Sequence, residues 1–205
     1  MRPKEILDLV RLEFQLDGQQ KHARGGILLY VVSAIYICYL SFRQLNDPDM
    51  WNALFWIILL FAAFNALARS FQREDEGRQL YLYTLVSPAS VILARTAYNM
   101  LMLLVLALLS LGVYLMFLGS NALEGAEVGQ FFLVVVLGSM GIAAVLSLIS
   151  ALAGRAGSGL GLMAILGFPV VLPILLIIIR ASSNALKGIE WSANSKYLLW
   201  LILVD

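Results

Sequence analysis

The stretch GRAGSGLG, Gly154–Gly161, is the part of the sequence nearest to a phosphate-binding loop. Loops that hold nucleotide phosphates use glycines in this way, followed by a lysine and a hydroxyl residue in the motif G-x-x-x-x-G-K-[ST]. The stretch lacks both of those residues, so we do not expect it to bind ATP. The spacing Gly157-x-x-x-Gly161 fits close packing between helices better. The sequence therefore predicts that this chain does not hydrolyse ATP by itself.

Residues for other reactions are also absent from the strongly apolar segments, which carry no clear Asp, Glu, Lys, Arg or His. Ion-coupled carriers usually keep such residues inside the bilayer. Hydrolysis there needs a nucleophile with its base, or an acidic metal cluster. The single histidine, His22, lies beside an apolar segment, and four methionines are more typical of packing than of ligation: Met102, Met116, Met140 and Met163. We expect no enzyme activity and no bound metal.

The composition is that of a membrane protein. Of 205 residues, 61% are hydrophobic and 13% are charged, whereas soluble domains are about one quarter charged. Runs of roughly 18 apolar residues predict membrane-spanning helices. Five runs approach or exceed this length: Gly26–Phe42, Trp51–Ala68, Thr96–Leu118, Phe131–Leu152 and Leu160–Ile179. We therefore predict an all-α polytopic transmembrane bundle that forms a single domain over residues 1–205. The net charge of +1 gives no reason to expect nucleic acid as a partner.

A sixth apolar run, Tyr197–Val204, has only eight residues. At 1.5 Å per residue it cannot cross a hydrocarbon layer of about 30 Å. Extending it backwards would bury Lys187, Glu190 and Lys196. We expect about six spans, with the sixth incomplete here or the chain a fragment of a longer protein.

Basic residues are unequally divided between the predicted loops. Four of the fourteen lie in the first and fifth loops: Arg43, Arg180, Lys187 and Lys196. The other ten precede the first span or lie in the second and fourth loops. Because cytoplasmic loops carry an excess of Lys and Arg, we expect the N-terminus and the loop at residues 69–95 to be cytoplasmic.

An amphipathic helix is predicted within residues 1–25, ahead of the first span. Over Lys4–Leu16 the apolar residues share one face, and Lys4 and Arg11 lie on the other, which suits a helix in the cytoplasmic headgroup layer. Glu13 falls near the middle of the apolar face. Either it snorkels or the helix bends there, or a base such as Arg69 or Arg73 pairs with it.

Several residues in the spans suit helix packing. Asn65 and Asn99 can form hydrogen bonds between helices. The fourth span has a face of small residues: Gly138, Gly141, Ala143, Ala144 and Ser147. Pro169 and Pro173 remove backbone donors from the fifth span, which predicts a kink; whether the kink also acts as a hinge stays open.

The loop FQREDEGRQLYLYTLVSPAS, Phe71–Ser90, has five charged residues within Arg73–Arg78. Its acidic residues suit a helix N-terminus, and Pro88 would end such a helix before the third span. The leucines and tyrosines of the loop fit a period of 2 as well as one of 3.6. Periodicity alone therefore does not predict a docking helix.

The chain resembles the membrane subunits of ATP-binding-cassette exporters, and among them the B subunit of the cytochrome c maturation system, haem exporter protein B. The resemblance covers most of the chain. It is most specific in RLEF (Arg11–Phe14), in the segment Ala66–Thr96, and in GLGLMAILGFPVVLPILLI (Gly159–Ile177). Relatives often have a small residue and an acid just after Gly77, where this chain has Arg78, Gln79 and Tyr81. The short sixth segment departs from the family as well.

The resemblance implies a coupling helix in the second cytoplasmic loop that docks on an ATPase subunit. The matching positions are Glu74, Asp75, Glu76, Gly77, Leu80, Leu82, Leu85 and Pro88. It also implies a homodimer with two ATPase subunits, a haem-handling membrane subunit and a small single-span subunit, in the bacterial inner membrane. ATP would be bound by the ATPase partner, and haem would be transported or held by a partner, since no span has a histidine to ligate its iron.

Two alternatives remain from the residues. The chain could be the permease for another hydrophobic or amphipathic substrate, or a membrane assembly scaffold without a transport role. Co-purification of an ATPase whose turnover rises on association separates the permeases from the scaffold.

Overall fold

The computed structural model describes residues 3–18, 21–42, 45, 47–67, 86–155 and 159–204. Within these ranges the protein is all-helical, as predicted. The helices are α1 (Pro3–Gly18), α2 (Lys21–Phe42), α3 (Pro48–Leu67), α5 (Pro88–Leu118), the 3₁₀ helix η1 (Asn121–Leu123), α6 (Val128–Arg155), α7 (Gly159–Leu186) and α8 (Trp191–Val204).

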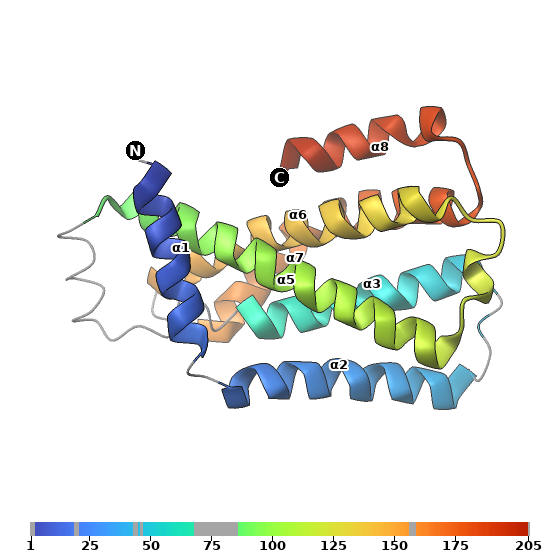
Figure 1. Ribbon diagram of the computed structural model, residues 1–205, viewed down its shortest axis with the longest axis horizontal. Coiled ribbons are helices and arrows are strands. Elements are labelled where there is room, and N and C mark those ends of the chain that lie inside the picture. Colours follow the sequence, from blue (N-terminus) through green and yellow to red (C-terminus); the bar gives the residue numbers. More distant parts are fainter. Residues whose placement is uncertain are drawn as a thin grey trace.

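Five helices are long and apolar enough to cross a membrane, and each overlaps one predicted span. They are Gly25–Phe42, Pro48–Leu67, Pro88–Leu118, Val128–Ala153 and Gly161–Leu186. Successive spans run in opposite directions, and α1 lies across one end of the bundle against α5 (Figure 1). We call this the α1 end. The far end holds the α5–α6 and α7–α8 connections.

Two span boundaries differ from the prediction by more than three residues. The third span begins at Pro88 rather than Thr96, so the last part of the predicted 69–95 loop is helix α5. The fifth span runs to Leu186 rather than Ile179. Assigning Arg180 to a loop was therefore wrong, because a single charge interrupts the apolar pattern without ending the helix.

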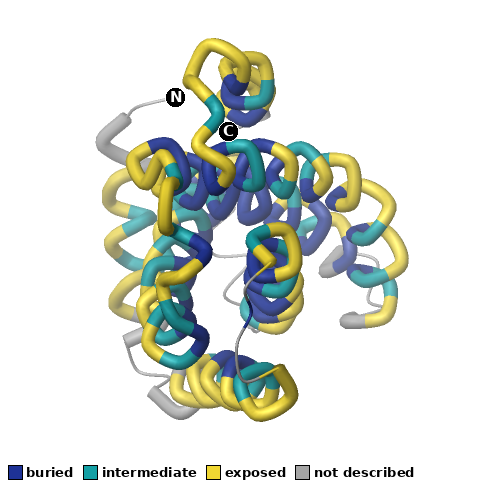
Figure 2. Tube along the Cα trace, turned by 90° about the vertical axis from the view of Figure 1, so that its right-hand side faces the viewer, coloured by how far each residue is buried: buried dark blue, intermediate teal, exposed yellow. Residues whose placement is uncertain are grey.

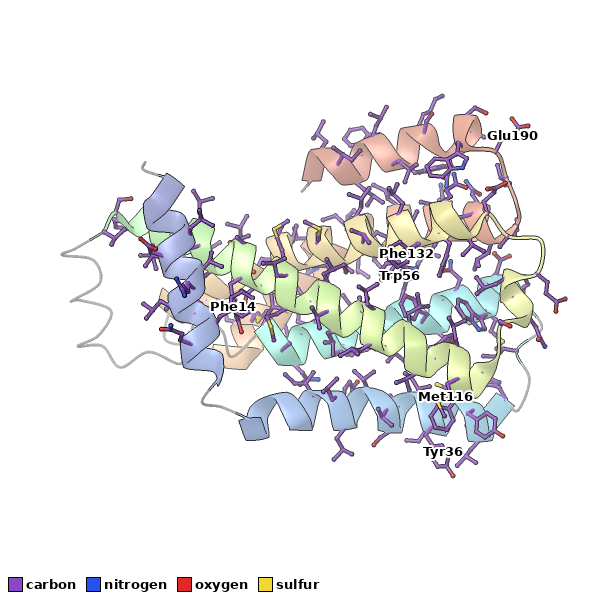
Figure 3. The ribbon with its side chains drawn as sticks, in the orientation of Figure 1. Phe14, Tyr36, Trp56, Met116, Phe132 and Glu190 are labelled. Carbon is purple, nitrogen blue, oxygen red and sulfur yellow. The ribbon has the colours of Figure 1, made fainter. Side chains whose placement is uncertain are left out.

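Helix α6 is the centre of the bundle. The share of buried residues is 61% in its span and 11% in that of α2. Viewed along the helices, buried residues lie where the central helices face one another (Figure 2). Aromatic side chains of α3 fill this core, and the ring of Trp56 lies against α6 at Gly138 (Figure 3). A Cβ at Gly138 would lie 2.8 Å from that ring.

Close packing between helices is observed at Gly138, within the predicted small-residue face, and at Gly167, outside it. Gly138 of that face contacts Trp56, and Gly167 is packed against Phe64, 2.8 Å from where its Cβ would be. Gly161, in contrast, has no atom within 4 Å of a Cβ built on it. Close packing at Gly161 is therefore not observed, and Gly157 is outside the described residues.

Buried polar side chains join the helices of the bundle. Asn99 of α5 donates from Nδ2 to Ser147 Oγ of α6 at 2.9 Å, which confirms its predicted interhelical bond. Asn65 instead donates to the Phe61 carbonyl of its own helix at 3.0 Å. Asn65 is exposed at the rim of α3, where the backbone of the preceding turn is the nearest acceptor.

The sixth segment is short, as the sequence predicted, although its helix begins earlier. Helix α8 has 14 residues, or about 21 Å, and lies along α6 and α7. Asn194 fixes its first turns, because its Nδ2 donates to the Ala181 carbonyl at 2.8 Å. Asn184 donates to Asn194 Oδ1 at 3.2 Å.

Candidate functional site

The predicted coupling positions mostly lie outside the described residues. These are Glu74, Asp75, Glu76, Gly77, Leu80, Leu82 and Leu85. Arg69 and Arg73, the partners considered for Glu13, are outside them as well. The structure does describe both helices that flank this segment, because α3 ends at Leu67 and α5 begins at Pro88. The contacts that hold these two helix ends determine which helices would move if residues 68–87 were displaced.

Pro88, the one described coupling position, is the first residue of α5. Ser87 is the N-cap, with extended backbone angles, and its Oγ accepts from the Ser90 N–H at 3.3 Å. A serine N-cap followed by proline is a strong helix start, because proline has no N–H to leave unpaired and its φ already suits the helix. Ser87-Pro88, which the sequence predicted to end a preceding helix, is the start of α5.

An ion pair joins α1 to α5 seven residues further along. Arg95 Nε donates to Glu13 Oε1 at 3.0 Å, and the side chains are 5% and 23% exposed, respectively. Phe14 meets Tyr98 edge to face, with ring centroids 4.9 Å apart, where α1 crosses α5 (Figure 3). Glu13 is thus paired with Arg95, and α1 is one continuous helix from Pro3 to Gly18.

The third residue named for the interfacial helix, Arg11, has a different position. It is exposed on α1, as the predicted polar face requires. Glu13 and Phe14 face α5, whereas Arg11 faces away from the protein interior. The short motif RLEF therefore contributes one exposed base and two contacts to α5.

The other helix flanking the coupling segment is held by α6. Ser150 Oγ donates to the carbonyl of Leu67, the last residue of α3, at 3.0 Å. Ser147, one turn earlier on α6, accepts from Asn99 of α5. Two neighbouring hydroxyls of α6 therefore contact α3, which precedes residues 68–87, and α5, which follows them. Ser150 was missed in the sequence because an isolated serine in an apolar span has no distinctive pattern.

At the α1 end, contacts between side chains connect α1, α3, α5 and α6. Among the residues that the structure describes, no group of three His, Cys, Asp or Glu side chains could hold a metal ion. The two predicted hinge residues, Pro169 and Pro173, lie inside α7, which continues through both.

The family model described as CcmB protein matches residues 4–204. No curated protein sequence matches the chain significantly. The match covers nearly the whole chain, including all five spans and α1. The chain therefore belongs to the CcmB family, the membrane permease component of the haem-export system for cytochrome c maturation.

Proposed function

We propose that this chain is the permease subunit of an ATP-binding-cassette complex in haem delivery or export for cytochrome c maturation. A cytoplasmic ATPase subunit would dock on residues 68–87, and its movement would enter the bundle through α3 and α5. The observation that carries this is the anchoring of both helix ends: Leu67 to Ser150, and Arg95 to Glu13. A segment whose two ends are tied to the bundle passes its displacement to the bundle.

The proposed complex contains two copies of this chain, two ATPase subunits, a haem-handling membrane subunit and a small single-span subunit. It would lie in the bacterial inner membrane with the N-terminus in the cytoplasm. This chain would leave haem ligation to its partners, because its one histidine, His22, precedes the Gly25–Phe42 span. A purified dimer that bound haem through a Met or Cys ligand within the bilayer would overturn that part.

The test uses the full complex and replaces Glu74, Asp75 and Glu76 together by alanine. We expect the ATPase subunit to be lost on co-purification and the rise in its turnover to disappear. The matched control replaces three exposed carboxylates near the far end by alanine: Glu124, Glu127 and Glu190. This control should keep the ATPase bound.

Two outcomes would contradict the proposal. If the variant lacking Glu74, Asp75 and Glu76 co-purifies with the ATPase as the wild type does, coupling does not use this segment. If no ATPase associates with the wild-type chain, the protein is a membrane scaffold and not a transporter subunit.

A further inference from the structure

Four buried polar atoms near the far end have no hydrogen-bond partner among the residues that the structure describes. They are Trp51 Nε1 and Asn52 Oδ1 on α3, and both Nε2 and Oε1 of Gln130 on α6. All three residues are 0% exposed. Buried polar groups in folded proteins are nearly always paired with protein or with ordered water. Inside a membrane-spanning bundle an unpaired group is especially costly, because lipid offers no substitute partner.

The buried polar side chains at the α1 end are paired directly. Arg95 bonds Glu13, Asn99 bonds Ser147, and Ser150 bonds the end of α3. In the described part of the chain the only further unpartnered buried side-chain atom is Thr96 Oγ1. It is a hydroxyl that can turn to a carbonyl of its own helix. The unpartnered groups are therefore concentrated at the far end.

The three side chains lie where α3 and α6 begin, and both helices begin at the far end (Figure 1). Trp51 and Asn52 are consecutive on α3, and Phe131 follows Gln130 on α6. The rings of Trp51 and Phe131 have centroids 5.9 Å apart, so the two stretches are in contact across the helices. All of these residues are within the first five of their helices, or about 7 Å from the start. The aqueous phase is therefore close to them.

The chemistry of these atoms suits a small neutral molecule. The indole N–H of Trp51 donates, the Oδ1 of Asn52 accepts, and the amide of Gln130 does both. None of the groups carries a charge that would call for an ion. The Asn52 amide is held in place, because its Nδ2 donates to the Ile179 carbonyl at 2.9 Å. Buried water typically makes about three hydrogen bonds to such groups.

We propose that Trp51, Asn52 and Gln130 form an internal water site between α3 and α6 near the far end. Water there satisfies the donors and acceptors of both helices at once. The helices are thus joined by direct bonds at the α1 end and through exchangeable water at the far end. This difference lets α3 shift against α6 at the far end without leaving a side chain unpaired. The inference does not depend on haem or on the ATPase subunit.

Hydroxyl-radical labelling with short X-ray pulses tests the site in the assembled complex. Radicals form from water and oxidise the side chains beside it, so a fully buried side chain is labelled only where water lies next to it. Trp51 is the reporter, read by mass spectrometry. Met163 is the control within the same molecule, because it is 1% exposed, easily oxidised and near the α1 end of α7. We expect labelling of Trp51 and little at Met163.

Two variants show whether the Gln130 amide holds the water. Gln130→Leu removes both unpartnered atoms at similar volume, and we expect it to abolish the labelling of Trp51. Ser139→Ala is the matched control: Ser139 is also 0% exposed on α6, but its Oγ is bonded to the Val136 carbonyl. It should leave the labelling of Trp51 at the wild-type level.

Two results would overturn the inference. Trp51 labelled no more than Met163 in the wild type would mean that α3 and α6 meet in a dry core. Unchanged labelling of Trp51 in Gln130→Leu would mean that the amide does not hold the water. If Gln130→Leu does not fold, the wild-type comparison of Trp51 with Met163 decides alone.

Discussion

Glu13 of α1 and Arg95 of α5 form an ion pair in which the arginine side chain is almost completely buried. The two residues are 82 positions apart in the sequence. Their contact joins α1 to α5, the span that follows residues 68–87. The acid that is out of place on the apolar face of α1 is therefore one of the residues that attach this helix to the bundle.

Glu13→Gln should destabilise the protein by about 2 kcal/mol, because a buried charge loses its charged hydrogen-bond partner. Arg11→Gln on the same helix is the control and should change stability little, since Arg11 is exposed. Thermal unfolding in lipid nanodiscs measures both. Combining Glu13→Arg with Arg95→Glu should recover part of the loss in the single charge reversals. The absence of any recovery would show that the pair does not act as a charge pair.

Gly138→Ala should destabilise the bundle by about 1–3 kcal/mol, the usual cost of overpacking a core. The added methyl would lie 2.8 Å from the Trp56 ring and 3.0 Å from Ile178. Gly161→Ala is the matched control, because that position is open and alanine favours helix over glycine. It should be neutral or slightly stabilising. A similar melting temperature for the two variants would mean that Trp56 moves aside without cost.

Ser150→Ala should reduce both stability and coupling. It removes the bond to the Leu67 carbonyl, which in membrane bundles is worth about 0.6–2 kcal/mol, and frees the end of α3. The control is Ser110→Ala: that serine is also buried, but its bond to the Leu106 carbonyl lies within one helix. Stimulated ATPase turnover in the complex should fall for Ser150→Ala only. Equal turnover in the two variants would argue against transmission through α3.

Lys187→Ala at the far end should have a small effect. Lys187 Nζ lies 2.7 Å from Asp49 Oδ2, but both side chains are about half exposed. Exposed ion pairs of this kind contribute about 0.2–1 kcal/mol and weaken with salt. We expect a shift in the melting temperature smaller than that of Glu13→Gln, and smaller still at high salt. A larger shift in melting temperature than that of Glu13→Gln would show that the Lys187–Asp49 pair contributes more to stability than the Glu13–Arg95 pair.

The fold was largely predictable because apolar runs of membrane length leave few alternatives. Boundaries were less predictable: Pro88 starts α5 inside the predicted loop, and Arg180 lies inside α7. The α1–α5 contact could be anticipated only in part. Glu13 was recognised as needing a partner. Arg95 was assigned to a loop, and the sequence did not show that folding brings its side chain to Glu13. Gly167 and Ser150 could not be identified, since their roles depend on which helix lies opposite.

The length of α5 links this chain to the thickness of its membrane. Its 31 residues span about 46 Å, against a hydrocarbon layer of about 30 Å. The surplus corresponds to about eleven residues, enough to place Arg95 and Tyr98 in the headgroup layer at the α1 end. A thicker bilayer would draw the Glu13–Arg95 pair toward the acyl chains, and a thinner one would expose it to water. We therefore expect the attachment of α1 to depend on the thickness of the bilayer as well as on α5.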